Sequence, residues 1–350
     1  MKLLLALSAL IALLGPGLSQ GQTSSGFPPL PSIPKTGQLP SNPGATSFTF
    51  IVAGDNRPAT KTPKQPKTLS QIFKHAQKFK PVFFLWCGDT ISGHTTDGPT
   101  LQVQYQKFIE AASKAQVPIF NAPGNHEMDI VLKQSKETIE IPNAQMFAFY
   151  LAYMQPSGSP SSAYGAFNYG NSRFIAMNTE EIAPQDLVRS PGRVVASGLK
   201  LDPGYVSAEQ IELLKQDLAA NKDKDHIFVF MHHPIKPSKA ASGLDSVTAA
   251  TLEQIFAQYS KVSYVLAAHE HLYYNASGST KTPSSWTTGT SPIYLVTGGG
   301  GAELDKCGSN PNNYCGEFHH YLVFTVAGPT VTVQVVELQK PTTKKHGGKK

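Results

Sequence analysis

Carboxylates stand directly after two apolar runs in this sequence. The run 82–87 ends at Gly88 and Asp89, and the run 47–53 ends at Gly54 and Asp55. A continuous apolar run predicts a strand buried on both faces. Because ligands bind beyond the carboxyl ends of the strands in open α/β sheets, both carboxylates lie where chemistry is expected. One such dipeptide alone is more simply a turn that closes a strand, and the repetition argues against that interpretation.

Three further predicted strands end in amide or imidazole side chains, which are Asn125 and His126 after 117–122, His232 and His233 after 226–231, and His269 and His271 after 264–268. Each alone has a simple structural explanation, since Asn forms turns and a lone His is most often a hydrogen-bonded structural residue. Together with the carboxylates they form a ligand set suited to zinc, manganese or iron. His269 and His271 are two residues apart, so on an extended strand both face one side, which suits two neighbouring ions.

Helical periodicity separates these strands. Apolar residues at helical spacing predict helices over 69–79, 101–112, 207–218 and 252–259, and further strands are expected at 173–178, 293–297, 321–326 and 330–336. Strand, helix, strand, helix, strand from 47 to 122 is a βαβαβ unit, and the chain is predicted to be of the α/β class. Region 128–165 is less periodic, apart from a helical stretch at 144–154, and we interpret it as an insertion that covers the site.

The ordered motifs resemble those of the calcineurin-like metallophosphoesterases, the superfamily that includes purple acid phosphatases. The family pattern D-x-H, GD, GNH-D/E, H and G-H-x-H is similar to Asp55-Asn56-Arg57, Gly88-Asp89, Gly124-Asn125-His126-Glu127, His232 and His269-Glu270-His271. The resemblance covers 47–338. It implies an α/β (α+β) fold, a four-layer sandwich of two mixed β-sheets flanked by helices.

The resemblance also implies a centre with two divalent ions, Zn, Mn or Fe. It assigns Asp89 as the bridge, Asp55 and His271 to the first ion, and Asn125, His232 and His269 to the second. His232 is preferred to His233 because the family ligand stands two residues before a proline, here Pro234. His126 matches the histidine that binds the phosphate and protonates the leaving alkoxide.

The resemblance implies hydrolysis of a phosphate ester. The ester resists attack because it is anionic, and two ions about 3.5 to 4 Å apart neutralise it and acidify a shared water to give a hydroxide nucleophile. His126 would supply the proton to the leaving oxygen. We therefore expect an exported metal-dependent phosphoesterase that acts on a small-molecule phosphomonoester or phosphodiester.

Three positions depart from the family pattern. Arg57 stands where the family has its first His, Ala268 replaces a Gly, and Ser92 stands where purple acid phosphatases have a Tyr ligand. Arg stays protonated and does not ligate metals, so the first site is expected to be weak or completed by water, with Arg57 binding a substrate phosphate oxygen. The alternative is a non-catalytic metal- or phosphate-binding relative. His94 is a further ligand candidate, although an exposed loop histidine is the favoured interpretation.

The ends of the chain have their own signatures. A basic residue, an apolar run and small residues predict a cleaved secretory signal at 1–19, and hence a secreted or periplasmic protein. Residues 20–46 are expected to be a Pro/Ser/Gly-rich linker, 47–338 the catalytic domain and 339–350 a disordered basic tail. The net charge of +6 lies partly in that tail, so no specific nucleic-acid partner is inferred. No second segment of transmembrane length occurs.

The remaining candidates are cysteines, glycines and two histidines. Turn-forming residues between Cys307 and Cys315 favour a local disulfide, whereas Cys87 is expected to be a buried thiol. A Cys or Ser hydrolase is disfavoured because Cys87 lies in a strand and no GxSxG occurs. The glycine run 298–301 either brings backbone close to the site or forms a flexible turn. His319 and His320 are expected to be structural.

Overall fold

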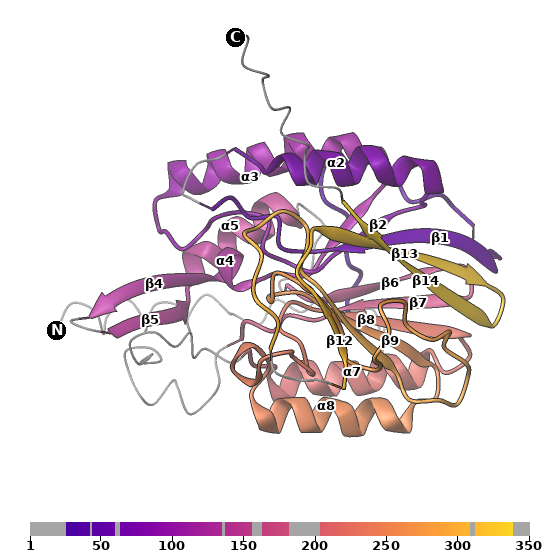
Figure 1. Cartoon of the computed structure of the whole chain (residues 1–350). Coiled ribbons are helices and arrows are strands. Elements are labelled where there is room, and N and C mark those ends of the chain that lie inside the picture. Colours follow the sequence, from indigo (N-terminus) through magenta and orange to yellow (C-terminus); the bar gives the residue numbers. More distant parts are fainter. Residues whose placement is uncertain are drawn as a thin grey trace, which may run out of the picture.

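The structure is a computed structural model that describes residues 26–42, 44–59, 64–134, 137–155, 163–181, 204–308 and 312–338. The expected signal sequence and basic tail lie outside the described residues. Two mixed β-sheets lie face to face, with helices on the outer face of each (Figure 1). The predicted four-layer α/β sandwich is therefore confirmed.

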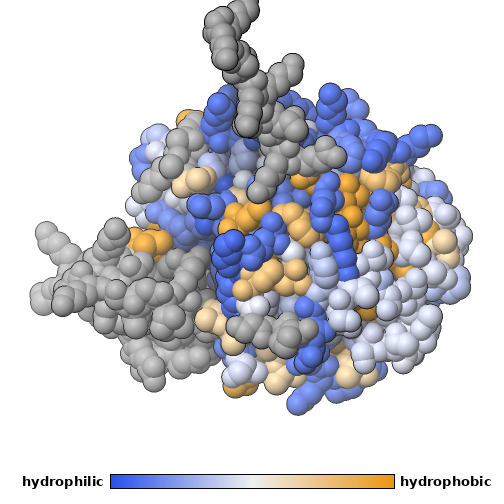
Figure 2. Space-filling view, viewed as in Figure 1, coloured by the Kyte–Doolittle hydropathy of each residue, from blue (hydrophilic) through white to orange (hydrophobic). Residues whose placement is uncertain are grey.

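The first sheet has five strands in the order β14-β13-β1-β2-β3. Their bounds are β1 Ser47–Ala53, β2 Phe84–Trp86, β3 Ile119–Asn121, β13 His320–Ala327 and β14 Thr330–Glu337. Strands β1, β2 and β3 are parallel and are joined by α2 (Lys67–Ala76) and α3 (Gly98–Ala112). This is the predicted βαβαβ unit. Hydrophilic side chains dominate the visible surface over α2 and α3 (Figure 2).

The second sheet has seven strands in the order β12-β10-β11-β9-β8-β7-β6. Their bounds are β6 Gly165–Tyr169, β7 Ser172–Ala176, β8 His226–Phe230, β9 Val262–Ala267, β10 Tyr273–Asn275, β11 Ile293–Thr297 and β12 Tyr314–Gly316. Strands β7, β8, β9 and β11 run parallel, and α7 (Ala208–Ala220) and α8 (Ser246–Gln258) cover their outer face (Figure 1). The predicted histidine-bearing strand ends follow β8 and β9.

Aromatic side chains join the two sheets. The Phe50 ring of β1 lies 5.2 Å from Phe174 and 5.1 Å from Phe228 of the second sheet, and 4.9 Å from Phe324 of its own sheet, measured between ring centroids. All four side chains are fully buried. Burial of a Phe contributes about 1.5–3 kcal/mol, so this layer fixes how the two sheets, and the loops at their carboxyl ends, meet.

Part of the expected linker packs on the domain, which corrects the prediction for 26–46. Phe27, Leu30 and Ile33 are buried. The Leu30 amide donates to Ala166 of β6 at 3.0 Å, and the Ile33 amide donates to Ile119 of β3 at 2.7 Å. These strands are the outer strands of different sheets, so this segment connects the two sheet edges. The few apolar residues among its prolines and serines carry the packing.

The insertion at 128–165 contains a hairpin that the sequence analysis did not predict. It runs from α4 (Asn125–Met128) into the antiparallel strands β4 (Asp129–Gln134) and β5 (Glu137–Pro142), and then into the expected helix α5 (Ala144–Met154). Short 3₁₀ turns occur at Gln77–Phe79, Ser113–Ala115 and Ala240–Ser242. Within the described residues, no helix has both the length and the apolarity needed to cross a bilayer.

Glu127 connects the ends of β2 and β3. Its buried carboxylate accepts hydrogen bonds from the amides of Asp89 (2.9 Å), Thr90 (2.5 Å), Ile91 (3.2 Å) and Gly124 (2.8 Å), and from the Thr90 hydroxyl (2.8 Å). These donors stabilise the ionised carboxylate. Burial, followed by repulsion from Asp89, raises the pKa of Glu127. The loop that carries Asp89 is thereby held against the loop that carries Asn125.

The cysteines and His320 behave as predicted. Cys307 and Cys315 form a disulfide, and Cys87 is a buried thiol whose pKa is raised by burial. The fully buried His320 ring hydrogen-bonds the Phe318 carbonyl through Nδ1 (3.0 Å), and its Nε2 lies 3.1 Å from the Thr297 hydroxyl. A neutral ring donates at Nδ1 and accepts at Nε2, which satisfies both contacts.

His320 makes folding stability depend on pH. Burial lowers the pKa of His320 to about 4 from an ordinary value of 6.5, so the unfolded chain binds the extra proton as the pH falls from 6.5 to 4. Stability is fully present above this window and is lost within it, by about 3 kcal/mol for this one group. Urea unfolding of wild type and His320→Asn, both treated with a chelator, measures the free energy of unfolding across pH 4–7. This free energy should decline less steeply with falling pH in the variant. Parallel pH dependences in the two proteins would contradict this role of His320.

Candidate functional site

Asp55 and Asp89 stand at the carboxyl ends of the neighbouring strands β1 and β2. Both have left-handed backbone conformations, with φ of 58° and 57°, which non-glycine residues adopt at a cost. The Asp55 amide donates to the Gly88 carbonyl at 3.1 Å. Both side chains are buried, and neither oxygen of Asp55 has a well-formed hydrogen bond. A buried carboxylate with orphaned oxygens is expected where a cation binds.

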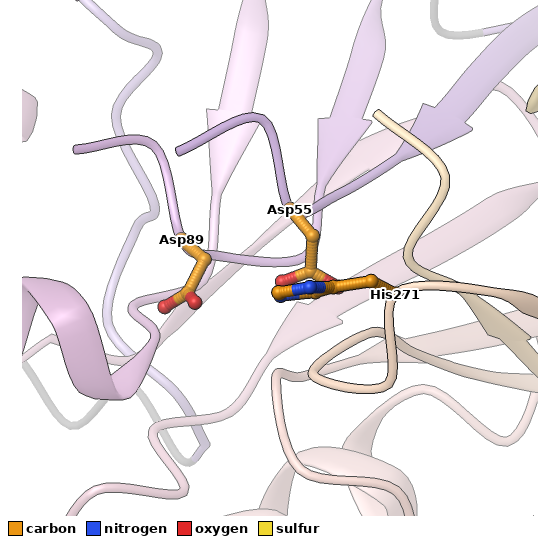
Figure 3. Close-up of side chains that lie close together, drawn as sticks. All are labelled: Asp55, Asp89 and His271. Atoms are coloured by element: carbon orange, nitrogen blue, oxygen red, sulfur yellow. The ribbon is translucent and has the colours of Figure 1, made fainter. Parts of the chain in front are cut away.

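His271 completes a cluster with these two carboxylates. Asp55, Asp89 and His271 each offer one ligand atom, and these atoms all lie within 4.8 Å of one another. Figure 3 shows the His271 ring beside the Asp55 carboxylate. The ring hydrogen-bonds the Glu303 carbonyl through Nδ1 at 2.7 Å, and its backbone amide donates to Asp305 at 3.1 Å. Nε2 is therefore the atom left to bind a metal.

The pKa shifts of Asp55 and His271 favour the binding of a cation. Burial, and then repulsion from Asp89, raises the pKa of Asp55 well above its usual range. Burial, reinforced by the Arg57 guanidinium, lowers the pKa of His271 to about 4. The histidine is thus neutral and able to donate its lone pair at ordinary pH. A nearby positive charge would stabilise the ionised form of both carboxyl groups.

A second cluster forms around His232. Its Nδ1 hydrogen-bonds the Cys87 carbonyl at 2.8 Å, and burial lowers its pKa, so the ring is neutral with a lone pair on Nε2. Nε2 lies 3.1 Å from Asn125 Oδ1, 3.2 Å from His269 Nδ1 and 3.4 Å from Asp89 Oδ1. Oxygen and nitrogen atoms of four side chains are thus gathered around one point, and their types suit a divalent cation.

The neighbouring His233 has a different setting. Its Nδ1 lies 2.7 Å from Glu180 Oε1, and its ring lies against that of His269, with centroids 4.0 Å apart. The structure therefore places His232, and not His233, among the ligand atoms of the second cluster. All six residues predicted as metal ligands lie in the two clusters, and Asp89 belongs to both.

The glycine run brings backbone close to the site, which is the first of the two alternatives. The Gly300 amide donates to the Gly54 carbonyl at 2.9 Å, and the Ala302 amide donates to the Asp55 carbonyl at 2.8 Å. A Cβ on Gly298 would lie 2.3 Å from Asp55 Oδ2. A side chain at position 298 would thus displace the ligand carboxylate.

Arg57 and His126 flank the bridging carboxylate. Arg57 Nε lies 3.4 Å from Asp89 Oδ2, and its side chain is one quarter exposed. His126 Nε2 lies 3.8 Å from the same oxygen, while Nδ1 hydrogen-bonds the Ser92 carbonyl at 2.7 Å. Arg57 therefore presents N–H donors beside the two clusters, and His126 presents Nε2, which donates when the ring is protonated, at positions that a bound anion would share.

Several residues of the site were not identified from the sequence. Glu127 was matched to a motif without a role, and Glu303 and Asp305, which hold His271, follow no motif of the resemblance. His94 was interpreted as an exposed loop residue or a substitute ligand. It is instead half-buried against His126, with ring centroids 3.9 Å apart, so the preference for an exposed residue is wrong.

Comparison with known proteins gives one family and several similar folds. A family model described as calcineurin-like phosphoesterase matches residues 48–273. The structure of purple acid phosphatase PPD1 from yellow lupin (Lupinus luteus) seeds is 16% identical with a TM-score of 0.60, covering 85% of this chain and 54% of that chain. This chain thus spans about half the length of that protein.

Two other solved structures have similar folds. A dimetal phosphatase from Danio rerio is 13% identical with a TM-score of 0.52, covering 84% of this chain and 100% of that chain. PhoD is 16% identical with a TM-score of 0.52, covering 85% of this chain and 70% of that chain. No curated protein sequence matches the chain. Because the family model covers more than half of the sequence, the chain belongs to the calcineurin-like phosphoesterase family.

Proposed function

We propose that the chain is a metal-dependent phosphoesterase that hydrolyses a small-molecule phosphomonoester or phosphodiester. The observation that carries this proposal is the convergence of Asn125 Oδ1, His269 Nδ1 and Asp89 Oδ1 on His232 Nε2, at 3.1–3.4 Å, beside the cluster of Asp55, Asp89 and His271. Family membership supports a phosphatase-type hydrolase. Hydrogen bonding alone does not account for the contact between His232 Nε2, which carries a lone pair in the neutral ring, and the Asn125 carbonyl oxygen, because both atoms are acceptors.

The residues take distinct roles. Asp89 would bridge two ions, Asp55 and His271 would hold the first, and Asn125, His232 and His269 would hold the second. When bound, divalent Zn, Mn or Fe would neutralise the ester and acidify an attacking water. Arg57 binds a phosphate oxygen, and protonated His126, which keeps its Nδ1 proton on the Ser92 carbonyl, donates its Nε2 proton to the leaving oxygen.

Arg57 sets this chain apart from the family pattern. Its guanidinium lies 3.4 Å from Asp89 Oδ2, the oxygen on the side of the phosphate-binding donors. The first site has Asp55, Asp89 and His271 but lacks the family's additional histidine. We infer a second ion that binds tightly and a first ion that binds weakly or with water completing its shell.

Arg57 also supports a second candidate function, a non-catalytic binding protein. In that case one ion would be held at the His232 cluster, and Arg57 would bind an anion without turnover. Hydrolysis of an aryl phosphate with added manganese or zinc, lost on chelation, would exclude this candidate. Tight phosphate binding with no turnover in any metal would favour it.

We propose further that the protein is exported, as the sequence of residues 1–19 indicates. The Cys307–Cys315 disulfide supports this, because such bonds persist in oxidising compartments. N-terminal sequencing of the exported protein should give a start near residue 20.

Asp89→Ala should abolish turnover and metal retention together, since Asp89 belongs to both clusters. The expected loss of turnover is at least about 1000-fold, because several kcal/mol of charge stabilisation disappear with the ions. Hydrolysis of an aryl phosphate and metal content after gel filtration measure the two effects. Asp223→Ala, on the exposed loop before β8, is the control and should leave both unchanged. Retained hydrolysis by Asp89→Ala would exclude the assignment.

Arg57→Ala should raise KM for the phosphate ester by about 10- to 100-fold, the value of charge-assisted hydrogen bonds. Arg57→Lys keeps the charge but cannot make bidentate hydrogen bonds, so it should restore only part of the affinity for the phosphate ester. Arg57→His should supply the missing ligand and increase the number of tightly bound ions, measured by metal analysis. Two tight ions in the wild type, with KM unchanged in Arg57→Ala, would contradict this role.

A further inference from the structure

The loop 91–94 wraps closely around His126. The Ser92 carbonyl accepts the hydrogen bond from His126 Nδ1 at 2.7 Å. Gly93 has φ of 49°, and a Cβ there would lie 1.5 Å from the His126 carbonyl oxygen. The Gly93 amide donates to the buried side chain of Gln104 of α3 at 3.0 Å. The backbone of this loop is therefore fixed against His126 on one side and α3 on the other.

His94 places its own ring on His126. The two ring centroids are 3.9 Å apart, with an angle of 54° between the ring planes. His94 Nδ1 hydrogen-bonds the Asp129 carbonyl at 3.0 Å, which holds the ring in this position. The residue has φ of 50°, a conformation that costs energy for a residue with a side chain. Neither the metal clusters nor the hydrophobic core uses this histidine.

The contact matters because the terminal ring torsion of a histidine is broad, and the hydrogen bond at Nδ1 fixes the ring mainly along the direction of that bond. His94 covers one face of the ring and restricts its rotation further. Nε2 is then held 3.8 Å from Asp89 Oδ2, at the edge of both metal clusters.

We propose that His94 is a positioning residue that aims the Nε2 proton of protonated His126 at the leaving oxygen of the ester. The inference rests on the proposed function. In the reaction the water oxygen forms a new P–O bond, the ester P–O bond breaks, and the leaving oxygen takes the proton from His126. The proton of the attacking water passes to solvent, which later reprotonates His126.

A positioning role has a signature that simple destabilisation lacks. A leaving group that forms a stable anion departs with little proton donation, whereas a basic leaving group depends on it. Loss of His94 should therefore harm esters of weakly acidic alcohols much more than esters of acidic phenols. A general loss of folded or metal-bound protein would lower both rates by the same factor.

The experiment compares kcat/KM for 4-nitrophenyl phosphate and phenyl phosphate in wild type, His94→Ala, His94→Phe and His126→Ala. His94→Ala should lose about twofold with 4-nitrophenyl phosphate and about 10-fold or more with phenyl phosphate, because misplacement of a catalytic group carries costs of this order. His94→Phe keeps a ring against His126 and should recover most of the phenyl phosphate rate. His75→Ala, in α2, is the control.

The double variant His94→Ala/His126→Ala should be no more selective than His126→Ala alone, because His94 acts through His126. Thermal unfolding and metal content are measured for each variant, so that only folded, metal-bound proteins are compared. An equal loss on both esters, failure of His94→Phe to recover the phenyl phosphate rate, or additive effects in the double variant would overturn the positioning role. A wild type that hydrolyses neither ester would overturn the proposed function with it. A larger loss of rate with phenyl phosphate than with 4-nitrophenyl phosphate in His126→Ala, but not in His94→Ala, would overturn this inference alone.

Discussion

The site depends on buried acceptor atoms that lie close to one another. Both oxygens of Asp55 lack well-formed hydrogen bonds, and His232 Nε2 faces Asn125 Oδ1 at 3.1 Å. An uncompensated buried polar group costs about 1–3 kcal/mol, and more when it is charged. The packed aromatic layer around Phe50 stabilises the sheets well enough to hold these atoms together. A cation that satisfies them would stabilise the folded chain as well as provide chemistry.

Backbone geometry imposes this convergence. Asp55, Asp89 and His269 all have left-handed φ values, so each strand end turns sharply and directs its side chain across the sheet edge. Glycines permit the close approach that follows. A Cβ on Gly88 would lie 2.8 Å from His232 Nδ1, and one on Gly124 would lie 2.4 Å from Asp89 Oδ1. The motif glycines are thus required by close contact with Asp89 and His232.

The sequence predicted the elements whose signals are local. Apolar runs that end in Asp89 or His232, and helical spacing between them, depend on neighbouring residues and were correctly interpreted. The packing of 26–36 was missed because Leu30 and Ile33 find partners far away in the chain, at strands β6 and β3. Asp305 was missed for the same reason, since its contact with His271 spans 34 residues and has no periodic signal.

Arg57 and the first metal cluster meet at one carboxylate oxygen. Arg57 Nε lies 3.4 Å from Asp89 Oδ2, and the positive charge of Arg57 also contributes to the lowered pKa of His271. A guanidinium so placed gives Asp89 a permanent countercharge, which a dissociable ion cannot. It would also repel a cation held by Asp55 and His271, because like charges in a buried site interact strongly. In the proposed function, substrate binding and occupancy of the first site would therefore be coupled, because a phosphate that draws Arg57 away from Asp89 would free that oxygen for the ion.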